Sequence, residues 1–134
     1  MPLAVIIGAS PDPERPSNLA VARLLARGWT VVPVHPRAAA IHGVPAIRSL
    51  HEAPAQPELV CSYVNPEIGA GLLPAVARLR PRALWLNPGS ADARLIAAAQ
   101  ALGLRTVDAC LLVALATGDP LDCLGGATPP ASAR

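Results

Sequence analysis

The 134-residue sequence contains no phenylalanine, and aromatic residues make up only 2% of it. It also contains no lysine, because all of its basic residues are arginines. The missing lysine excludes a lysine Schiff base, a P-loop and a Tyr-x-x-x-Lys dehydrogenase site, which all require that side chain. The formal net charge is only +2 and aromatic stacking side chains are scarce, so nucleic acid is not expected as a partner.

Paired cysteines and targeting signals are missing as well. Cys61, Cys110 and Cys123 are odd in number and form no CxxC motif, so neither a disulfide framework nor a zinc site is indicated. We therefore expect free thiols in a reducing cytoplasm. The N-terminus lacks the positive segment of a signal peptide, and no apolar run approaches the ~18 residues of a membrane span.

Hydrophobic residues, at 52%, are abundant enough to build one well-buried core from Ala, Val, Leu and Ile. The sequence predicts a single domain over residues 1–124 and a frayed tail over residues 125–134. Apolar runs and helical spacing alternate along the chain. They predict strands at 3–9, 30–34, 59–64, 83–86 and 105–110, and helices at 17–26, 49–53, 66–79, 91–102 and 111–116.

This alternation indicates an α/β fold, a Rossmann-like, doubly wound parallel sheet of about five strands. We expect the spatial strand order 3-2-1-4-5. Ligands of such sheets bind beyond the C-terminal ends of the strands, at the switch point, which this order places between the first and fourth strands. The segments at those ends are Gly8-Ala9-Ser10, His35-Pro36-Arg37, Asn65-Pro66-Glu67, Asn87-Pro88-Gly89 and Asp108-Ala109-Cys110.

The first turn is not a GxGxxG motif, yet it has the parts of an anion site. Gly8 permits close approach of a ligand to the backbone, and the start of the following helix offers free N–H groups. Ser17 or Asn18 is expected to cap that helix, while Ser10 and Arg15 add a hydroxyl group and a positive charge. The alternative is an ordinary turn followed by an ordinary cap.

The end of the second strand distinguishes between nucleotides. Enzymes that use NAD place an acidic residue there to bind the ribose 2′-hydroxyl, and this chain has His35-Pro36-Arg37 instead. The Arg37 guanidinium suits a phosphate on the ribose, which both NADP and coenzyme A carry. The alternative is that Arg37 is a solvated loop residue. His35, His42 and His51 have no spacing typical of metal ligands, so no metal is expected.

The combination of Gly8-Ala9-Ser10, Arg15-Pro16-Ser17, Val34-His35-Pro36-Arg37 and Trp85-Leu86-Asn87-Pro88-Gly89 resembles small stand-alone CoA-binding domain proteins. The same domain occurs in the alpha subunit of succinyl-CoA synthetase. The resemblance covers about residues 3–112 and implies a Rossmann-like fold that binds coenzyme A. It implies that the first-turn residues surround the pyrophosphate and that His35, Pro36 and Arg37 lie near the ribose and its phosphate. Family members usually have Asn where His35 stands.

Two classes of function remain open on the sequence. The first is a CoA-binding or acyl-CoA-binding protein, non-catalytic or regulatory, and the second is a small NAD(P)-binding redox sensor or reductase. No nucleophile triad or carboxylate pair is evident, so a binding protein is favoured over an enzyme. Cys110 lies at the predicted ligand end of the fifth strand, but we favour an inert thiol there. The predicted ligand-binding residues are Gly8, Ala9, Ser10, Arg15, Ser17, Asn18, His35, Pro36, Arg37, Asn65, Pro66, Asn87 and Gly89.

Overall fold

The computed structural model describes residues 2–124, so the predicted tail at 125–134 lies outside the described residues. All the predicted strands and helices are present, with boundaries shifted by a few residues. The elements are β1 (Leu3–Ile7), α1 (Pro16–Ala26), β2 (Thr30–Val34), β3 (Ala40–Ile41), β4 (Val44–Pro45), the 3-10 helix η1 (Leu50–Glu52), β5 (Leu59–Ser62), α2 (Pro66–Leu79), β6 (Ala83–Leu86), α3 (Ala93–Ala101), β7 (Thr106–Asp108), α4 (Leu111–Thr117) and the 3-10 helix η2 (Pro120–Leu124).

Five parallel strands form the main sheet in the order β2-β1-β5-β6-β7, and β3 and β4 form a separate antiparallel hairpin. The predicted α/β class with a five-stranded parallel sheet is confirmed. The predicted order 3-2-1-4-5 is wrong, because β5 pairs directly with β1, from Ala4 with Leu59 to Ile7 with Ser62. The main-sheet strands therefore follow the order 2-1-3-4-5. The switch point lies between β1 and β5, rather than between the first and fourth strands.

Pro33 gives the physical reason why β2 lies at the edge of the sheet. The Pro33 carbonyl accepts a hydrogen bond from the Ile47 N–H at 2.9 Å, on the side away from β1. The N–H that proline lacks would point the same way, and a neighbouring interior strand would need that donor. Only an isolated bridge between Val34 and Ile47 extends the pairing there. Strand β2 is correspondingly only partly buried.

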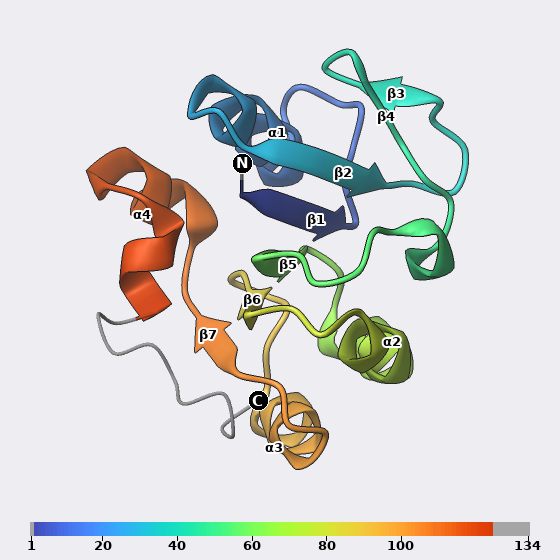
Figure 1. Cartoon of the computed structure of the whole chain (residues 1–134), viewed down its shortest axis with the longest axis vertical. Helices are drawn as coiled ribbons and strands as arrows, with labels where there is room; N and C mark the ends of the chain where they lie inside the picture. Colours follow the sequence, from blue (N-terminus) through green and yellow to red (C-terminus); the bar gives the residue numbers. More distant parts are fainter. Residues whose placement is uncertain (1, 125–134) are drawn as a thin grey trace.

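Helices cover both faces of the sheet, with α1 and α4 on one face and α2, α3 and η1 on the other (Figure 1). The side chains of β1 alternate between the two faces of the sheet. Ala4 and Ile6 pack beneath α1 and α4, whereas Val5 and Ile7 pack beneath α2 and α3. Since both faces are covered, β1 is apolar at every position and shows no polar alternation.

Candidate functional site

The C-terminal ends of β1 and β2, together with η1 and α2, surround a hollow of about 440 Å³. This volume lies within the range of roughly 300–1,000 Å³ that is typical of small-molecule sites. Four predicted ligand-binding residues line the hollow, namely Gly8, Ala9, His35 and Pro36. The hollow also adjoins the switch point between β1 and β5, where ligands of such sheets bind.

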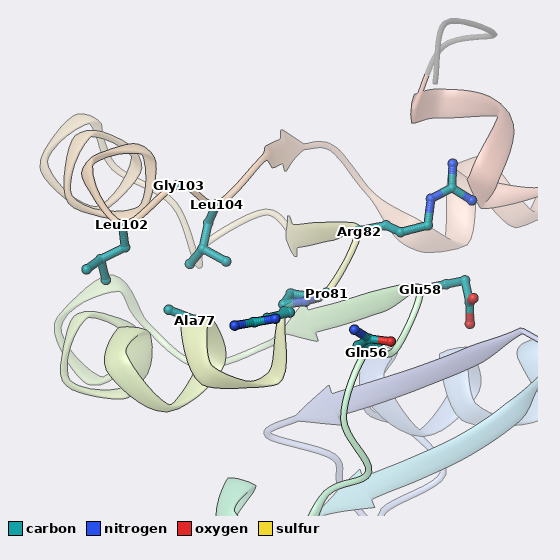
Figure 2. Close-up of a pocket in the computed structure, with 9 residues that line it drawn as sticks. Gln56, Glu58, Ala77, Pro81, Arg82, Leu102, Gly103 and Leu104 are labelled. Carbon is teal, nitrogen blue, oxygen red and sulfur yellow. The ribbon is translucent and has the colours of Figure 1, made fainter. Parts of the chain in front are cut away.

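A larger hollow, of about 730 Å³, lies at the opposite edge of the sheet, beside the ends of α2 and α3. Figure 2 shows Glu58 and Arg82 at one end of it and Leu102 and Leu104 at the other. The Glu58 and Arg82 side chains point away from each other in Figure 2, so they do not converge on one point, as polar groups do in most ligand sites. Ligands of parallel sheets bind at the C-terminal ends of the strands, and the polar groups of the larger hollow do not converge. We therefore place the candidate site at the smaller hollow, on the C-terminal edge of the sheet.

Gly8 forms the turn at the end of β1 with a φ of 78°. A Cβ atom added to it would lie 3.0 Å from Cγ1 of Val64 and 3.3 Å from the carbonyl carbon of Tyr63. Glycine is therefore required by the close contact between the ends of β1 and β5, as well as by its positive φ. The fold therefore needs glycine at this position. The sequence predicts that a ligand approaches the backbone closely at the same residue.

The prediction that Ser17 or Asn18 caps α1 is wrong. The N-cap is Arg15, and Pro16 occupies the first helical position, where its missing N–H is harmless. Ser17 and Asn18 instead lie in the first turn and are buried. Pro16 has shifted the start of the helix by one or two residues, because its fixed φ suits a first turn.

The N-terminus of α1 differs from those of α2 and α3. Asn65 caps α2 by accepting a hydrogen bond from the Ile68 N–H, and Asp92 caps α3 by accepting one from the Leu95 N–H. Helix α1 has no side-chain cap and no acidic residue in its first turn. Pro16 has no N–H and the Asn18 N–H donates to the Arg15 carbonyl at 3.0 Å, so the Ser17 N–H is the first-turn donor that lacks a side-chain cap. Together with the positive end of the helix dipole, this donor suits an anion.

Asn18 bridges two loops. Its amide nitrogen donates to the Ser10 carbonyl at 2.9 Å, and its amide oxygen lies 2.7 Å from Nε2 of His42. His42 occupies the tight turn between β3 and β4, with a φ of 51°. Asn18 and His42 thus hold the hairpin against the first turn. No pattern in the sequence pairs these two residues, which are 24 positions apart.

His35 organises the loop that follows β2. Its Nδ1 accepts hydrogen bonds from the N–H groups of Arg37 at 2.9 Å and Ala38 at 2.7 Å. The side-chain oxygen of an asparagine makes the same kind of turn, which explains how histidine replaces it here. Because Nδ1 of the His35 ring accepts these hydrogen bonds, a neutral ring carries its proton on Nε2. His35, which lines the hollow, therefore offers one N–H donor, at Nε2.

The sequence analysis missed the segment that closes the far side of the hollow. Arg48, Ser49 and His51 line it, whereas Arg15 and Arg37 do not, although all three arginines are exposed. The S-x-x-E pattern of Ser49 and Glu52 was a signal for a fixed helical start, and both hydrogen bonds of that capping box are present. Only the bridge from Ile47 to the end of β2 brings this segment to the hollow.

The predicted residues beyond β5 and β6 lie outside the hollow. Asn65 and Pro66 begin α2, and Gly89 forms an exposed turn with a φ of 89°. Asn87 is buried, and both ends of its amide are engaged. Its nitrogen donates to the Ser62 carbonyl at 3.1 Å, and its oxygen accepts from the Leu111 N–H at 2.9 Å. The Asn87 side chain therefore connects β5, β6 and α4.

All three cysteines are free, and they differ in exposure. Cys61 is buried in β5, where desolvation raises the pKa of its thiol and disfavours the reactive thiolate. Cys110 is half-buried after β7, and Cys123 is exposed. Burial also raises the pKa of Tyr63, with smaller contributions from Cys61 and Cys110. Over residues 2–124, the structure contains no group of three or more His, Cys, Asp or Glu suited to a metal ion.

The fold and this edge define an α/β protein with a switch-point site suited to a phosphorylated ligand. The chain belongs to the CoA binding domain family, which matches residues 4–116. Among the helices that the structure describes, none has the length and apolar character to cross a membrane.

Several solved structures share this fold. A crystal structure of an uncharacterized protein is 27% identical, with a TM-score of 0.79, over 88% of this chain and 97% of that one. A Thermus thermophilus protein is 26% identical, with a TM-score of 0.78, over 87% and 88%. The dinucleotide-forming acetyl-coenzyme A synthetase 1 of Ca. Korarchaeum cryptofilum is 17% identical, with a TM-score of 0.66, over 78% of this chain and 25% of the enzyme. The likeness to the synthetase shows the shared fold alone.

Proposed function

We propose that the protein binds coenzyme A or an acyl-CoA at the C-terminal edge of its sheet, in a non-catalytic or regulatory role. The observation that carries this proposal is the uncapped N-terminus of α1 beside the Gly8 turn. The Ser17 N–H, which has no side-chain cap, and the positive end of the helix dipole together suit a pyrophosphate. Membership of the CoA binding domain family indicates which pyrophosphate-containing ligand is meant.

In this proposal the pyrophosphate lies over the first turn and the start of α1. Its neighbours are Gly8, Ala9, Ser10, Ser17 and the exposed Arg15, while Asn18 positions the turn through the Ser10 carbonyl. The adenosine part lies beyond β2, near His35 and Pro36, which line the hollow, whereas the exposed Arg37 belongs to the same loop but does not line it. The rest of the ligand extends past the ends of β5 and β6, along Asn65, Pro66, Asn87 and Gly89.

The proposal concerns binding, because the likeness to the synthetase, at 17% identity, shows the shared fold alone. The two align over a quarter of that enzyme. The domain that we propose for CoA extends over residues 1–124. The three free cysteines support a reducing, cytoplasmic setting for this role.

The test is a panel of thermal unfolding measurements with CoA, acetyl-CoA, NAD, NADP and ATP. A ligand that binds only the folded state stabilises it by about 2.7 kcal/mol at a hundredfold excess over Kd, which raises Tm by on the order of 10 °C. We expect such a rise with CoA or acetyl-CoA. A rise with NADP alone favours the redox function instead, and no rise with any nucleotide rejects the proposal.

A matched pair of variants tests whether the pyrophosphate binds at the start of α1. Arg15→Ala removes a charge beside the start of α1, and Arg94→Ala removes an exposed charge from α3. We expect CoA affinity to fall severalfold in the first variant and to stay unchanged in the second, with equal Tm for the two free proteins. Equal affinities in both variants would place the pyrophosphate elsewhere.

A further inference from the structure

The segment from Ile47 to Glu52 forms a rigid wall beside the end of β2. The Ile47 N–H donates to the Pro33 carbonyl, and the His35 N–H donates to the Ile47 carbonyl, both at 2.9 Å. The Glu52 carboxylate accepts from the N–H groups of Arg48 at 3.1 Å and Ser49 at 3.3 Å. These bonds fix the backbone from which the Arg48 side chain extends.

The register of this contact places Arg48 beside His35. Val34 and Ile47 are paired in parallel, so the next residues along the two segments are His35 and Arg48. Both His35 and Arg48, which follow the two bridged residues, line the hollow. His51 lines it as well. No acidic side chain is among the described residues that line this hollow, so its polar groups suit an anion.

The remainder of the hollow is apolar. Val34 lies at the end of β2, Leu50 projects from η1 and Leu72 comes from α2, and all three line the space next to these polar groups. An apolar surface beside a few positively charged or donating groups suits a flat heterocyclic base joined to a phosphate. Arg37 is exposed and is not part of this lining.

We propose that the nucleotide end of the ligand occupies this hollow and that Arg48, assisted by Nε2 of His35, binds the phosphate on its ribose. The base then packs against Val34, Leu50 and Leu72. This inference rests on the proposed function and makes Arg48, rather than Arg37, the residue that distinguishes coenzyme A from dephospho-CoA. The guanidinium provides the paired donors that a phosphate accepts.

Calorimetric titration of CoA and dephospho-CoA into the wild type, Arg48→Ala and Arg37→Ala tests this assignment. Arg37→Ala is the matched control, because it removes an exposed arginine from the same edge of the sheet. We expect the wild type to prefer CoA by about tenfold or more, the effect of one or two charge-assisted hydrogen bonds. Arg48→Ala should lose this preference while its affinity for dephospho-CoA stays unchanged, and Arg37→Ala should keep it.

Arg48→Lys provides a further check, because it restores the positive charge and should recover part of the preference. Loss of the preference in Arg37→Ala, or its survival in Arg48→Ala, overturns the assignment to Arg48. Equal binding of the two ligands by the wild type overturns the ribose-phosphate site but leaves the proposed function standing. Failure of the wild type to bind either ligand instead rejects the proposed function itself.

Discussion

The two halves of the C-terminal edge of the sheet use polar residues differently. At the ends of β1 and β2, the start of α1 has no side-chain cap, and His35 presents Nε2 beside a hollow of about 440 Å³. At the ends of β6 and β7, the polar groups bind one another. Asn87 joins β5 to α4, and Nε1 of Trp85 donates to the Ala109 carbonyl at 2.9 Å.

This difference shows that a place at the ligand edge does not by itself make a residue a ligand contact. Asn87 and Ser10 follow strands of the same sheet, and the sequence analysis treated them alike. The buried Asn87 amide bonds two backbone groups, the Leu111 N–H and the Ser62 carbonyl, so its side chain serves the fold. At the β1 half, α1 begins without a side-chain cap, and residues at the ends of β1 and β2 line a hollow.

The largest expected effect is that of Asn87→Ala on stability. The buried Leu111 N–H would lose its partner, which costs about 1–3 kcal/mol. The Ser62 carbonyl would lose one of two bonds, at about 1 kcal/mol, and keep the bond from the Asn87 N–H, so we expect a loss of roughly 2–4 kcal/mol. Urea denaturation measures this loss. Titration of the folded variant with CoA should give an affinity within about threefold of the wild type.

Asn65→Ala is the control for this comparison. It removes a side chain that caps the exposed start of a helix, whereas Asn87→Ala removes a buried side chain that bonds two backbone groups. The expected cost of Asn65→Ala is about 1 kcal/mol. If Asn87→Ala kept its stability and lost CoA binding, the contrast between the two halves of the edge would be wrong.

A somewhat smaller effect is expected of Gly8→Ala, which changes the half of the edge that we assign to the ligand. The positive φ alone costs about 1–3 kcal/mol for a residue with a side chain. Gly43→Ala is a matched control, since its φ of 77° is nearly the same and a Cβ there would meet nothing within 4 Å. Chemical denaturation should show the larger loss for Gly8→Ala, because of its contact with Val64.

CoA titration of the same pair of variants separates strain from binding. Only Gly8→Ala should lose affinity, because Gly43 lies outside the proposed site. Equal losses of stability in the two variants would mean that the contact between β1 and β5 relaxes around a new methyl group.

The smallest effect is expected at the other edge of the sheet. Leu102 lines the 730 Å³ hollow and is 49% exposed, so Leu102→Ser should change stability by no more than about 0.5 kcal/mol. Its CoA affinity, measured by the same titration, should match that of the wild type. A tenfold loss of CoA affinity would mean that the ligand binds at the N-terminal edge of the sheet instead.

Part of the site was predictable from local sequence, and part was not. The Gly8 turn was predicted because the first apolar run ends in glycine. The loop at His35 was predicted because the second apolar run ends just before it. The start of α1 was misplaced because Ser17 and Asn18 are good caps in isolation, whereas Pro16 takes the first helical position. Arg48 was missed because its pairing with the end of β2 joins segments that are distant in sequence.

The sequence by itself determined the alternation of strands and helices, since apolar runs, prolines and glycines act over a few residues. It also excluded every mechanism that needs a lysine. The tertiary structure alone decided the strand order, the position of the switch point and the side chains that face the hollow. The presence of Pro33 is compatible with an edge strand, but which strand then lies beside β1 depends on the packing of whole layers. That choice brought β5 against Gly8, and the bridge beyond β2 brought Arg48 beside His35.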